Sequence, residues 1–146
     1  MRFRKAFFPT LKEAPAEAEV VSQEEFKTWL AERKEEAAAA PDLTPFADLD
    51  EAMELGEQTY AGACAVCHGN NGEGGVGVAF AGSDFATNEE HLDEHIDVLI
   101  NGRAAMPAFG AQLSPREIAA VVTYERNAWG NDTGDLIQPQ DVQDHE

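Results

Sequence analysis

One short segment constrains this chain more than any other: Cys64-Ala-Val-Cys67-His68. Cysteines at positions i and i+3 lie on one side of a helical turn, so both thiols can add to the two vinyl groups of a haem. The histidine that directly follows the second cysteine then lies over the iron. This C-x-x-C-H spacing is typical of a c-type haem attachment site. We therefore predict one covalent haem c, bound by Cys64 and Cys67, with His68 as an iron ligand.

Other chemistry for this segment is less well supported. A thioredoxin-like redox pair follows a strand and opens a helix, whereas here a helix is predicted to lead in and a glycine-rich loop to lead out. A zinc site needs about four ligands, and the remaining candidates, His91, His95 and His145, have no partner at a suggestive spacing. Two cysteines are too few for a disulfide framework.

A second axial ligand is predicted in a later loop. Met106 follows a predicted helix end, precedes a proline that fixes the local backbone, and is followed by a well-capped helix. The alternative ligands are His91 and His95, which we expect to be solvated on an acidic helix. A lone methionine can also fill a core, as we predict for Met53.

Histidine–methionine ligation has consequences for function. A thioether stabilises the ferrous state and raises the potential relative to two histidines. With both axial positions filled, the iron can only gain or lose an electron. The sequence therefore favours an electron carrier with no catalysis of its own.

Apolar periodicity and capping signals predict three helices in the region that carries the haem motif. Their starts are expected at Thr44-Pro45, at Thr87-Asn-Glu-Glu90 and at Ser114-Pro115-Arg116-Glu117. Their apolar stripes are Phe46, Leu49, Met53, Gly56 and Tyr60; Leu92, Ile96, Leu99 and Ile100; and Ile118, Val121 and Val122. Residues 69–86 are glycine-rich and are predicted as irregular loop.

The ends of the chain carry weaker signals. Ser22-Gln-Glu-Glu25 is a capping box that opens a helix with Phe26, Trp29 and Leu30 on its apolar face. The stretch from Arg2 to Phe8 is predicted as an edge strand, and residues 131–146 as extended or frayed chain.

Charge divides the chain at about residue 40. Residues 1–40 have a net charge of −1, whereas residues 41–146 combine three basic with twenty acidic residues, a net of −17. The acidic region is expected to repel nucleic acid and to attract basic protein partners at modest salt; the alternative is a solvated surface without such a role. No apolar run approaches the roughly 18 residues of a membrane span, and the N-terminus lacks the apolar stretch of an export signal.

Residues 44–130 resemble a class I cytochrome c domain. The resemblance is carried by Gly56 and Tyr60, Cys64 to His68, the Met106-Pro107-Ala-Phe-Gly110 loop, Leu113-Ser114, and the last helix through Tyr124. It implies a small all-α fold of three main helices around one haem. It also implies that the first and last helices cross near the glycine, with Tyr60 packed on Tyr124 or Trp129.

The chain lacks one residue that is common in this family, and its folding is expected to depend on the haem. No proline lies between Gly69 and Met106, so a carbonyl other than the usual one must orient the ring of His68. A domain of about 100 residues has little core of its own, so the apo-domain is expected to be largely unfolded.

A narrower resemblance is to cytochrome c oxidase subunit II with a fused C-terminal cytochrome c. Residues 20–31 are similar to the segment that closes the copper domain of such subunits, and Met1 to Arg4 to the stretch that begins at its last copper ligand. Tyr124 to Gly134, with Gln138-Pro139, is similar to their C-terminal end. The chain is therefore predicted to comprise an N-terminal extension and linker (1–43), a cytochrome c domain (44–130) and a C-terminal tail (131–146).

This resemblance implies a place in respiration. The haem would accept electrons from an external donor, basic or small, and pass them to an upstream copper domain of a haem-copper oxidase at the periplasmic face of the bacterial inner membrane. The copper ligands are absent from this chain, and upstream membrane helices would tether it. The alternatives are a free carrier in the soluble periplasm and a haem enzyme or sensor with an open axial position. Arg103 is expected either to pair with a haem propionate or to be solvated.

Overall fold

The computed structural model describes residues 22–29 and 41–145, which belong to two units, Met1–Ala40 and Pro41–Glu146. In the first unit, residues 23–29 form a helix whose predicted capping box is confirmed: the Ser22 amide donates to Glu25 at 2.8 Å and the Glu25 amide to Ser22 Oγ at 3.3 Å. The predicted edge strand at Arg2 to Phe8 and the similarity at Met1 to Arg4 lie outside the described residues.

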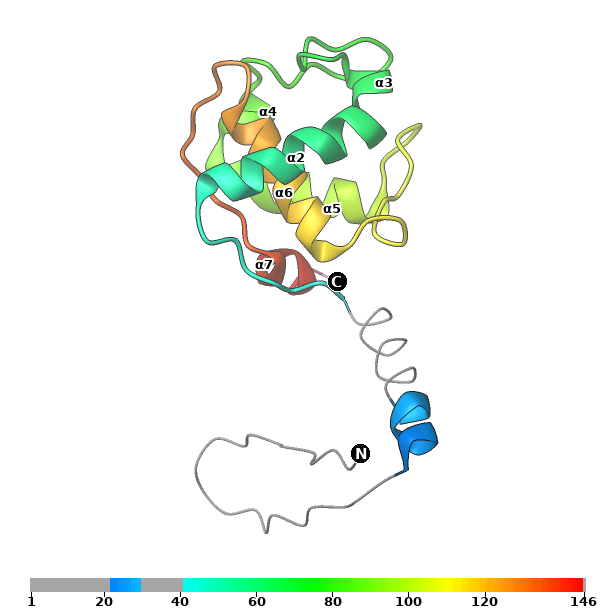
Figure 1. Cartoon of the computed structure of the whole chain (residues 1–146). Coiled ribbons are helices and arrows are strands. Elements are labelled where there is room, and N and C mark those ends of the chain that lie inside the picture. Colours follow the sequence, from blue (N-terminus) through cyan, green and yellow to red (C-terminus); the bar gives the residue numbers. More distant parts are fainter. Residues whose placement is uncertain (1–21, 30–40, 146) are drawn as a thin grey trace. The chain divides into compact units, whose positions relative to one another are not determined.

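The second unit consists of helices joined by loops (Figure 1). The helices are α2 (Leu49–Ala63), α3 (Ala65–His68), α4 (Asp84–Thr87), a 3₁₀ turn (Glu89–His91), α5 (Leu92–Asn101), α6 (Pro115–Asn127) and α7 (Pro139–Gln143). Within the described residues there is no strand, only an isolated bridge between Arg103 and Met106. The prediction of an all-α fold with three main helices, α2, α5 and α6, is confirmed.

Helices α2 and α6 cross at a glycine, as the resemblance implied. A Cβ atom at Gly56 would lie 2.3 Å from the Ala120 carbonyl oxygen and 2.6 Å from Tyr124 Cβ. One turn further along α2, the Tyr60 ring packs on both predicted partners, with centroid distances of 5.7 Å to Tyr124 and 4.9 Å to Trp129. Only glycine permits this approach of the two backbones.

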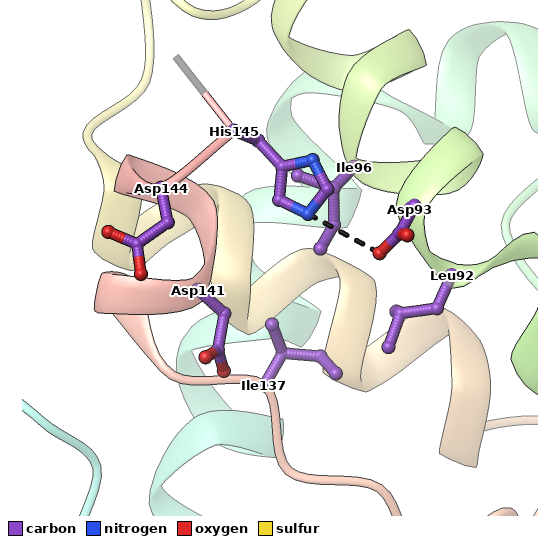
Figure 2. Close-up of a pocket in the computed structure, with 7 residues that line it drawn as sticks. All are labelled: Leu92, Asp93, Ile96, Ile137, Asp141, Asp144 and His145. Atoms are coloured by element: carbon purple, nitrogen blue, oxygen red, sulfur yellow. Dashed lines mark ion pairs between the residues drawn. The ribbon is translucent and has the colours of Figure 1, made fainter.

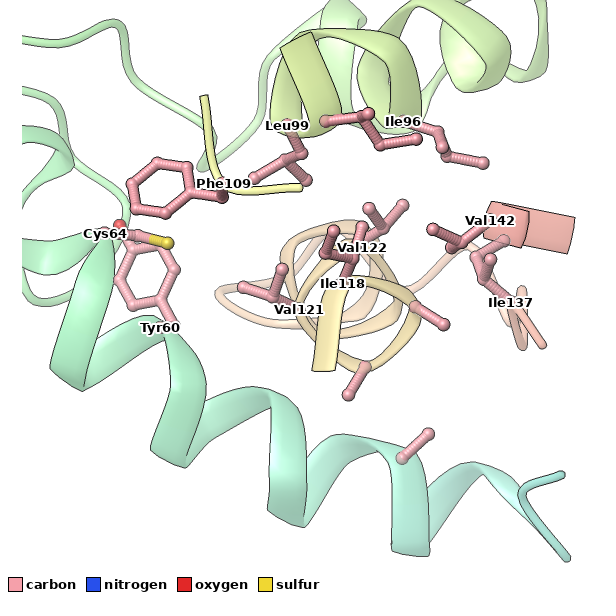
Figure 3. Packing of buried hydrophobic residues seen from close by; sticks show 14 of the residues in the cluster. Tyr60, Cys64, Ile96, Leu99, Phe109, Ile118, Val121, Val122, Ile137 and Val142 are labelled. Atoms are coloured by element: carbon pink, nitrogen blue, oxygen red, sulfur yellow. The ribbon is translucent and has the colours of Figure 1, made fainter. Parts of the chain in front are cut away.

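Helix α6 forms the centre of the core. Figure 3 shows Ile118, Val121 and Val122 of α6 between α2 on one side and Ile96 and Leu99 of α5 on the other. All five side chains are buried, which confirms the predicted inward faces of both helices. The predicted Ser114 capping box is also confirmed, because both of its reciprocal hydrogen bonds are present.

The predicted start of the first helix at Thr44 is wrong. Helix α2 begins at Leu49, and the Asp48 side chain caps it by accepting from the Glu51 amide. The preceding segment is held extended by tertiary contacts: Phe46 is buried, its amide donates to Gln138 Oε1 at 2.9 Å, and the Arg116 guanidinium lies 4.4 Å from its ring centroid. These contacts outweigh the local capping signal.

The predicted start at Thr87 is also wrong. Thr87 ends the short α4, which Ser83 caps, and Asn88 caps the 3₁₀ turn that follows. Helix α5 then begins at Leu92 and ends at the predicted cap, Gly102, which has a φ of 73°.

Part of residues 131–145 is helical, in contrast to the prediction of an extended or frayed tail. They fold back along α6 and end in α7, which buries Val142 completely. Ile137 is 5% exposed, and its amide donates to Thr123 Oγ1 at 3.0 Å. This segment therefore adds to the core. In the part of the chain that the structure describes, no helix has the length and apolarity needed to cross a bilayer.

Candidate haem-binding site

The predicted attachment residues lie in one tight turn at the end of α2. The amide of Cys64 closes α2 by donating to the Tyr60 carbonyl at 2.9 Å. The amides of Cys67 and His68 both donate to the Cys64 carbonyl at 3.1 Å. Both cysteines are free thiols, Cys64 buried and Cys67 half-buried. The structure thus places Cys64, Cys67 and His68 within one turn.

The environment of Cys64 suits an uncharged sulfur. Burial, with smaller contributions from the charges of Glu125 and Cys67, raises the pKa of the Cys64 thiol to about 12. A thiolate is therefore disfavoured at this position. A thioether, which carries no charge, is compatible with the same surroundings.

His68 presents one nitrogen in the state that a metal requires. Its Nδ1 lies 2.8 Å from the Val78 carbonyl oxygen. A carbonyl can only accept, so Nδ1 carries the proton, and in the neutral imidazole Nε2 then has the lone pair that a metal requires. Val78 therefore supplies the orienting carbonyl that the sequence left unassigned, and the donor set fits a haem iron.

A glycine loop encloses the His68 ring. A Cβ atom at Gly77 would lie 2.6 Å from His68 Cε1, so any side chain at this position would collide with the imidazole. The Gly77 amide donates to the Cys67 carbonyl, and the Gly74 amide to the His68 carbonyl, both at 2.8 Å. The Phe80 ring stacks on the imidazole with centroids 4.5 Å apart and planes inclined by 27°.

Met106 lies in a loop that backbone hydrogen bonds hold in place. Its amide donates to the Arg103 carbonyl at 2.9 Å, and the Arg103 amide donates back to the Met106 carbonyl at 3.1 Å. Further along, the Phe109 amide donates to the Leu99 carbonyl of α5 at 2.9 Å. Met106 is half-buried and packs against the hydrophobic cluster that includes Cys64 and Phe109 (Figure 3).

The alternative histidine ligands have other partners. His91 is partly exposed and lies between Asp84 at 3.3 Å and Glu94 at 3.4 Å. His95 was expected to be solvated, and this is wrong: it is 2% exposed, and its Nε2 lies 2.6 Å from a carboxylate oxygen of Glu125. The reason is that the face of α5 that carries His95 packs on α6.

Arg103 lies at the surface, and its pairing with a haem propionate stays a prediction. Its Nη2 donates to Glu94 Oε1 at 2.6 Å, and both side chains are about half exposed. The guanidinium is therefore engaged by a surface carboxylate. This hydrogen bond and the charge of Arg103 hold the pKa of Glu94 below its usual value.

Three residues around the site, Val78, Phe80 and Glu125, were not predicted from the sequence, and a fourth, His95, was considered only as a possible metal ligand. Two of them carried a detectable signal. His95 lies three residues after Leu92 and four before Leu99, on the apolar stripe of α5. Glu125 extends the buried stripe of α6 in the same way. Polar residues on two stripes that face one core are expected to pair. The carbonyl of Val78 had no such signal.

A separate pocket lies away from the predicted haem residues (Figure 2). Its volume is about 300 Å³, and it is lined by Leu92, Asp93, Ile96, Ile137, Asp141, Asp144 and His145. His145 lies 3.5 Å from Asp93 across its opening. Within the described residues, no group of three or more histidine, cysteine or acidic side chains could hold a metal ion.

An all-α fold in which the first helix runs into such a turn, and crosses the last main helix at a glycine, is that of a c-type cytochrome. The protein-family model described as "Cytochrome C oxidase, cbb3-type, subunit III" matches residues 51–124, half of the chain, and the chain belongs to this family of cytochrome c domains. It carries one covalently attached haem c and transfers electrons.

Curated proteins give the same class. The chain is 33% identical to "Alcohol dehydrogenase (quinone), cytochrome c subunit" of Gluconacetobacter polyoxogenes, over 60% of this chain and 21% of that protein. It is 34% identical to "Cbb3-type cytochrome c oxidase subunit FixP" of Azorhizobium caulinodans, over 64% and 31% respectively. It is 36% identical to "Cytochrome c6" of Gracilaria tenuistipitata var. liui, over 58% and 77%. The chain thus spans about a fifth to a third of the first two relatives.

Solved structures of cytochromes also align with part of this chain. Cytochrome CL from Methylophaga aminisulfidivorans aligns with a TM-score of 0.47 at 25% identity, over 64% of this chain and 65% of that chain.

Proposed function

We propose that Cys64 and Cys67 hold the haem through thioether bonds, and that His68 Nε2 and the Met106 sulfur are its axial ligands. The observation that most supports this ligation is the hydrogen bond from His68 Nδ1 to the Val78 carbonyl, which leaves Nε2 free for iron. The hydrogen-bonded loop around Met106 supports Met106 as the second axial ligand, because a thioether is a weak ligand and must be held in position. When bound, the haem supplies an iron that gains and loses one electron.

The surrounding residues orient the ligand and exclude water. Val78 fixes the imidazole plane and raises its basicity, and Phe80 covers one face of the ring. The Tyr60 hydroxyl donates to the Gly69 carbonyl at 2.8 Å and ties the start of the loop to α2. With both axial positions filled, the domain acts as a carrier of single electrons and performs no catalysis of its own.

We further infer that this domain is the electron-entry part of a haem-copper oxidase, resembling the fused C-terminal cytochrome of subunit II. The similarity of residues 20–31 and 124–139 to such subunits supports this, as does the oxidase subunit named by the matching family. The partners would be an upstream copper domain, the membrane subunits, and an external donor that is basic or small. The location would be the periplasmic face of the bacterial inner membrane, with a tether upstream.

The second candidate is a free carrier in the periplasm. It is favoured by the similarity to a cytochrome c6 of which this chain covers 77%. The segment at residues 20–31 discriminates between the two, because a free carrier has no use for it.

Haem staining of native membrane and soluble fractions, with the intact mass of the stained band, separates these proposals. The oxidase assignment predicts a membrane band that contains copper and is much heavier than 15.8 kDa. A soluble band of 15.8 kDa plus one haem would overturn it in favour of the free carrier.

A further inference from the structure

A histidine and a glutamate form a buried pair between α5 and α6. His95 is 2% exposed and Glu125 1% exposed, and the distance from His95 Nε2 to Glu125 Oε2 is 2.6 Å. The other ring nitrogen, Nδ1, is also buried and has no hydrogen-bond partner among the described residues. Two titratable groups in an apolar core are costly unless they are paired, and electron transfer through His68 and Met106 makes no use of them.

The pair lies one aromatic ring away from the proposed iron ligand. The Phe80 ring stacks on His68 with centroids 4.5 Å apart, and it also stacks on His95, at 5.8 Å and with an interplanar angle of 16°. The three rings are buried. Charge on the iron and charge on the pair therefore interact through protein interior, where salt and water screen little.

The pair can exist with two different charges. With a neutral imidazole, Nε2–H donates to the Glu125 carboxylate, and the pair carries one buried negative charge. One additional proton converts it into an imidazolium–carboxylate pair, or a neutral imidazole beside a carboxylic acid, with no net charge. Ferric iron adds one positive charge nearby and favours the negative form, whereas ferrous iron favours the protonated form.

The other titratable groups that face the pair do not compete for this role. Burial and the charge of Glu125 raise the pKa of Tyr60 in α2, so its phenol stays neutral. Cys64 lies at the end of α2 and, as a thioether of the haem, would carry no charge. Arg126 of α6 is committed to Asp135, at 2.8 Å from its Nε, and to the Ala86 carbonyl, at 3.0 Å.

Two further histidines lie near α5 but outside the core. His91 reaches the pair only across the Phe85 ring, at 5.8 Å from that ring's centroid, and is bound to surface carboxylates. His145 pairs with Asp93 in the pocket of Figure 2, at the surface. His91 therefore serves as a matched control for His95.

We propose that the His95–Glu125 pair binds one proton when the haem is reduced and releases it when the haem is oxidised, an inference that rests on the proposed ligation by His68. One electron passes from the redox donor to the iron, and one proton passes from solvent to the pair. Oxidation returns the electron to the acceptor and the proton to solvent. The domain thus couples electron transfer to proton uptake at a site made only of its own side chains.

The test is the midpoint potential of the haem-loaded protein as a function of pH. Histidine changes charge between about pH 5 and 8 in water, so the scan should extend beyond that range on both sides. The potential should fall with rising pH between two plateaus. A tenfold difference in proton affinity between the two redox states corresponds to about 59 mV for a one-electron couple.

Three variants assign the proton. Glu125→Gln keeps the shape but removes the charge, and should give a higher potential that no longer follows the wild-type pH curve. His95→Gln should also flatten the curve, whereas His91→Gln should retain it. A curve that is flat in the wild type, or equally steep in Glu125→Gln and His95→Gln, overturns the proposal, the latter because haem propionates or other groups would carry the proton.

A second measurement does not depend on the variants folding. Reduction of the wild-type protein in weakly buffered solution should take up a fraction of one proton per electron near the middle of the pH curve. No uptake at any pH overturns the proposal even if both core variants fail to fold. Failure of the proposed function is distinct, because it shows as missing covalent haem or as a spectrum without histidine–methionine ligation.

Discussion

The crossing of α2 and α6 and the loop over residues 69–83 are held together in opposite ways. At the crossing, Gly56 brings two backbones into contact, and the buried side chains of α6 fill the space around them. The loop buries chiefly Phe80 and Gly72, while Val76 and Val78 are 92% and 64% exposed. It is shaped by glycines and by backbone hydrogen bonds around His68. The geometry of the crossing therefore follows from packing within the chain. The shape of the loop follows from the haem ligand that it must hold in place.

The largest effect is expected when the haem is withheld. The double variant Cys64→Ala/Cys67→Ala should give an apo-domain that is largely unfolded, because the haem is then missing from the core and the remaining core is small. Circular dichroism and a thermal melt test this. A cooperative, native-like melt would show that the α2–α6 crossing suffices for folding, and would break the comparison.

Within the haem-loaded protein, the crossing should be the most sensitive point. Gly56→Val places side-chain atoms where the Ala120 carbonyl and Tyr124 lie, and should lower the free energy of unfolding by about 3 kcal/mol. The matched control is Gly62→Ala on the same helix, where nothing lies within 4 Å and a small gain of about 0.5 kcal/mol is expected. Urea denaturation measures both. Equal effects would contradict the close approach.

The next largest effect should come from the buried guanidinium that ties α6 to its neighbours. Arg126 is 1% exposed and donates to Asp135 and to the Ala86 carbonyl. Arg126→Met should cost about 2 kcal/mol, because it leaves that buried carbonyl without a donor. Urea denaturation should show this loss at pH 7, and no loss would mean that water replaces the guanidinium.

Arg103→Met is the control for that variant, because the Arg103–Glu94 pair is exposed. Its effect at pH 7 should be within the range of surface pairs, which is small. Arg103 lowers the pKa of Glu94 in the folded state, so the contribution of the pair is present above the unfolded pKa and is lost as pH falls through the folded one. Arg103→Met should therefore lose less stability than the wild type on acidification towards pH 3.

A smaller effect on stability than that of Arg126→Met should come from the loop. Gly77→Ala forces the His68 ring and the new methyl group apart, at a cost of about 1 kcal/mol. It should also weaken the bond from His68 Nδ1 to Val78 and raise the midpoint potential, because the imidazole becomes a poorer donor to iron. Potentiometry detects this shift, and Gly62→Ala should show none. An unchanged potential would mean that the loop does not tune the ligand.

The sequence predicted most of the helical packing at the α2–α6 crossing and less of the geometry of the loop. Residues that follow periodicity, such as Ile96 and Ile118, were predicted on the correct faces because burial repeats with the helix turn. The start of α2 was misplaced because Phe46 is held by Gln138, a contact between residues far apart in sequence. Such contacts are not encoded in local capping preferences.

The site was predictable where spacing alone defines it. The five residues of the haem motif fix their own geometry within one turn. The Val78 carbonyl could not be predicted, because any backbone carbonyl of a glycine-rich loop has the same chemistry. The burial of His95 was missed because its acidic neighbours suggested a solvated helix, although its position on the apolar stripe indicated the core.

The axial ligation by Met106 is the central claim, and carbon monoxide binding to the ferrous protein tests it most directly. Met106→Leu conserves volume, which keeps the cost in packing small, while opening one axial position. We expect that the wild type does not bind carbon monoxide and that Met106→Leu does. Met53 is a half-buried methionine of α2, and Met53→Leu should behave as the wild type. Binding by the wild type, or its absence in Met106→Leu, would contradict a closed His68–Met106 haem.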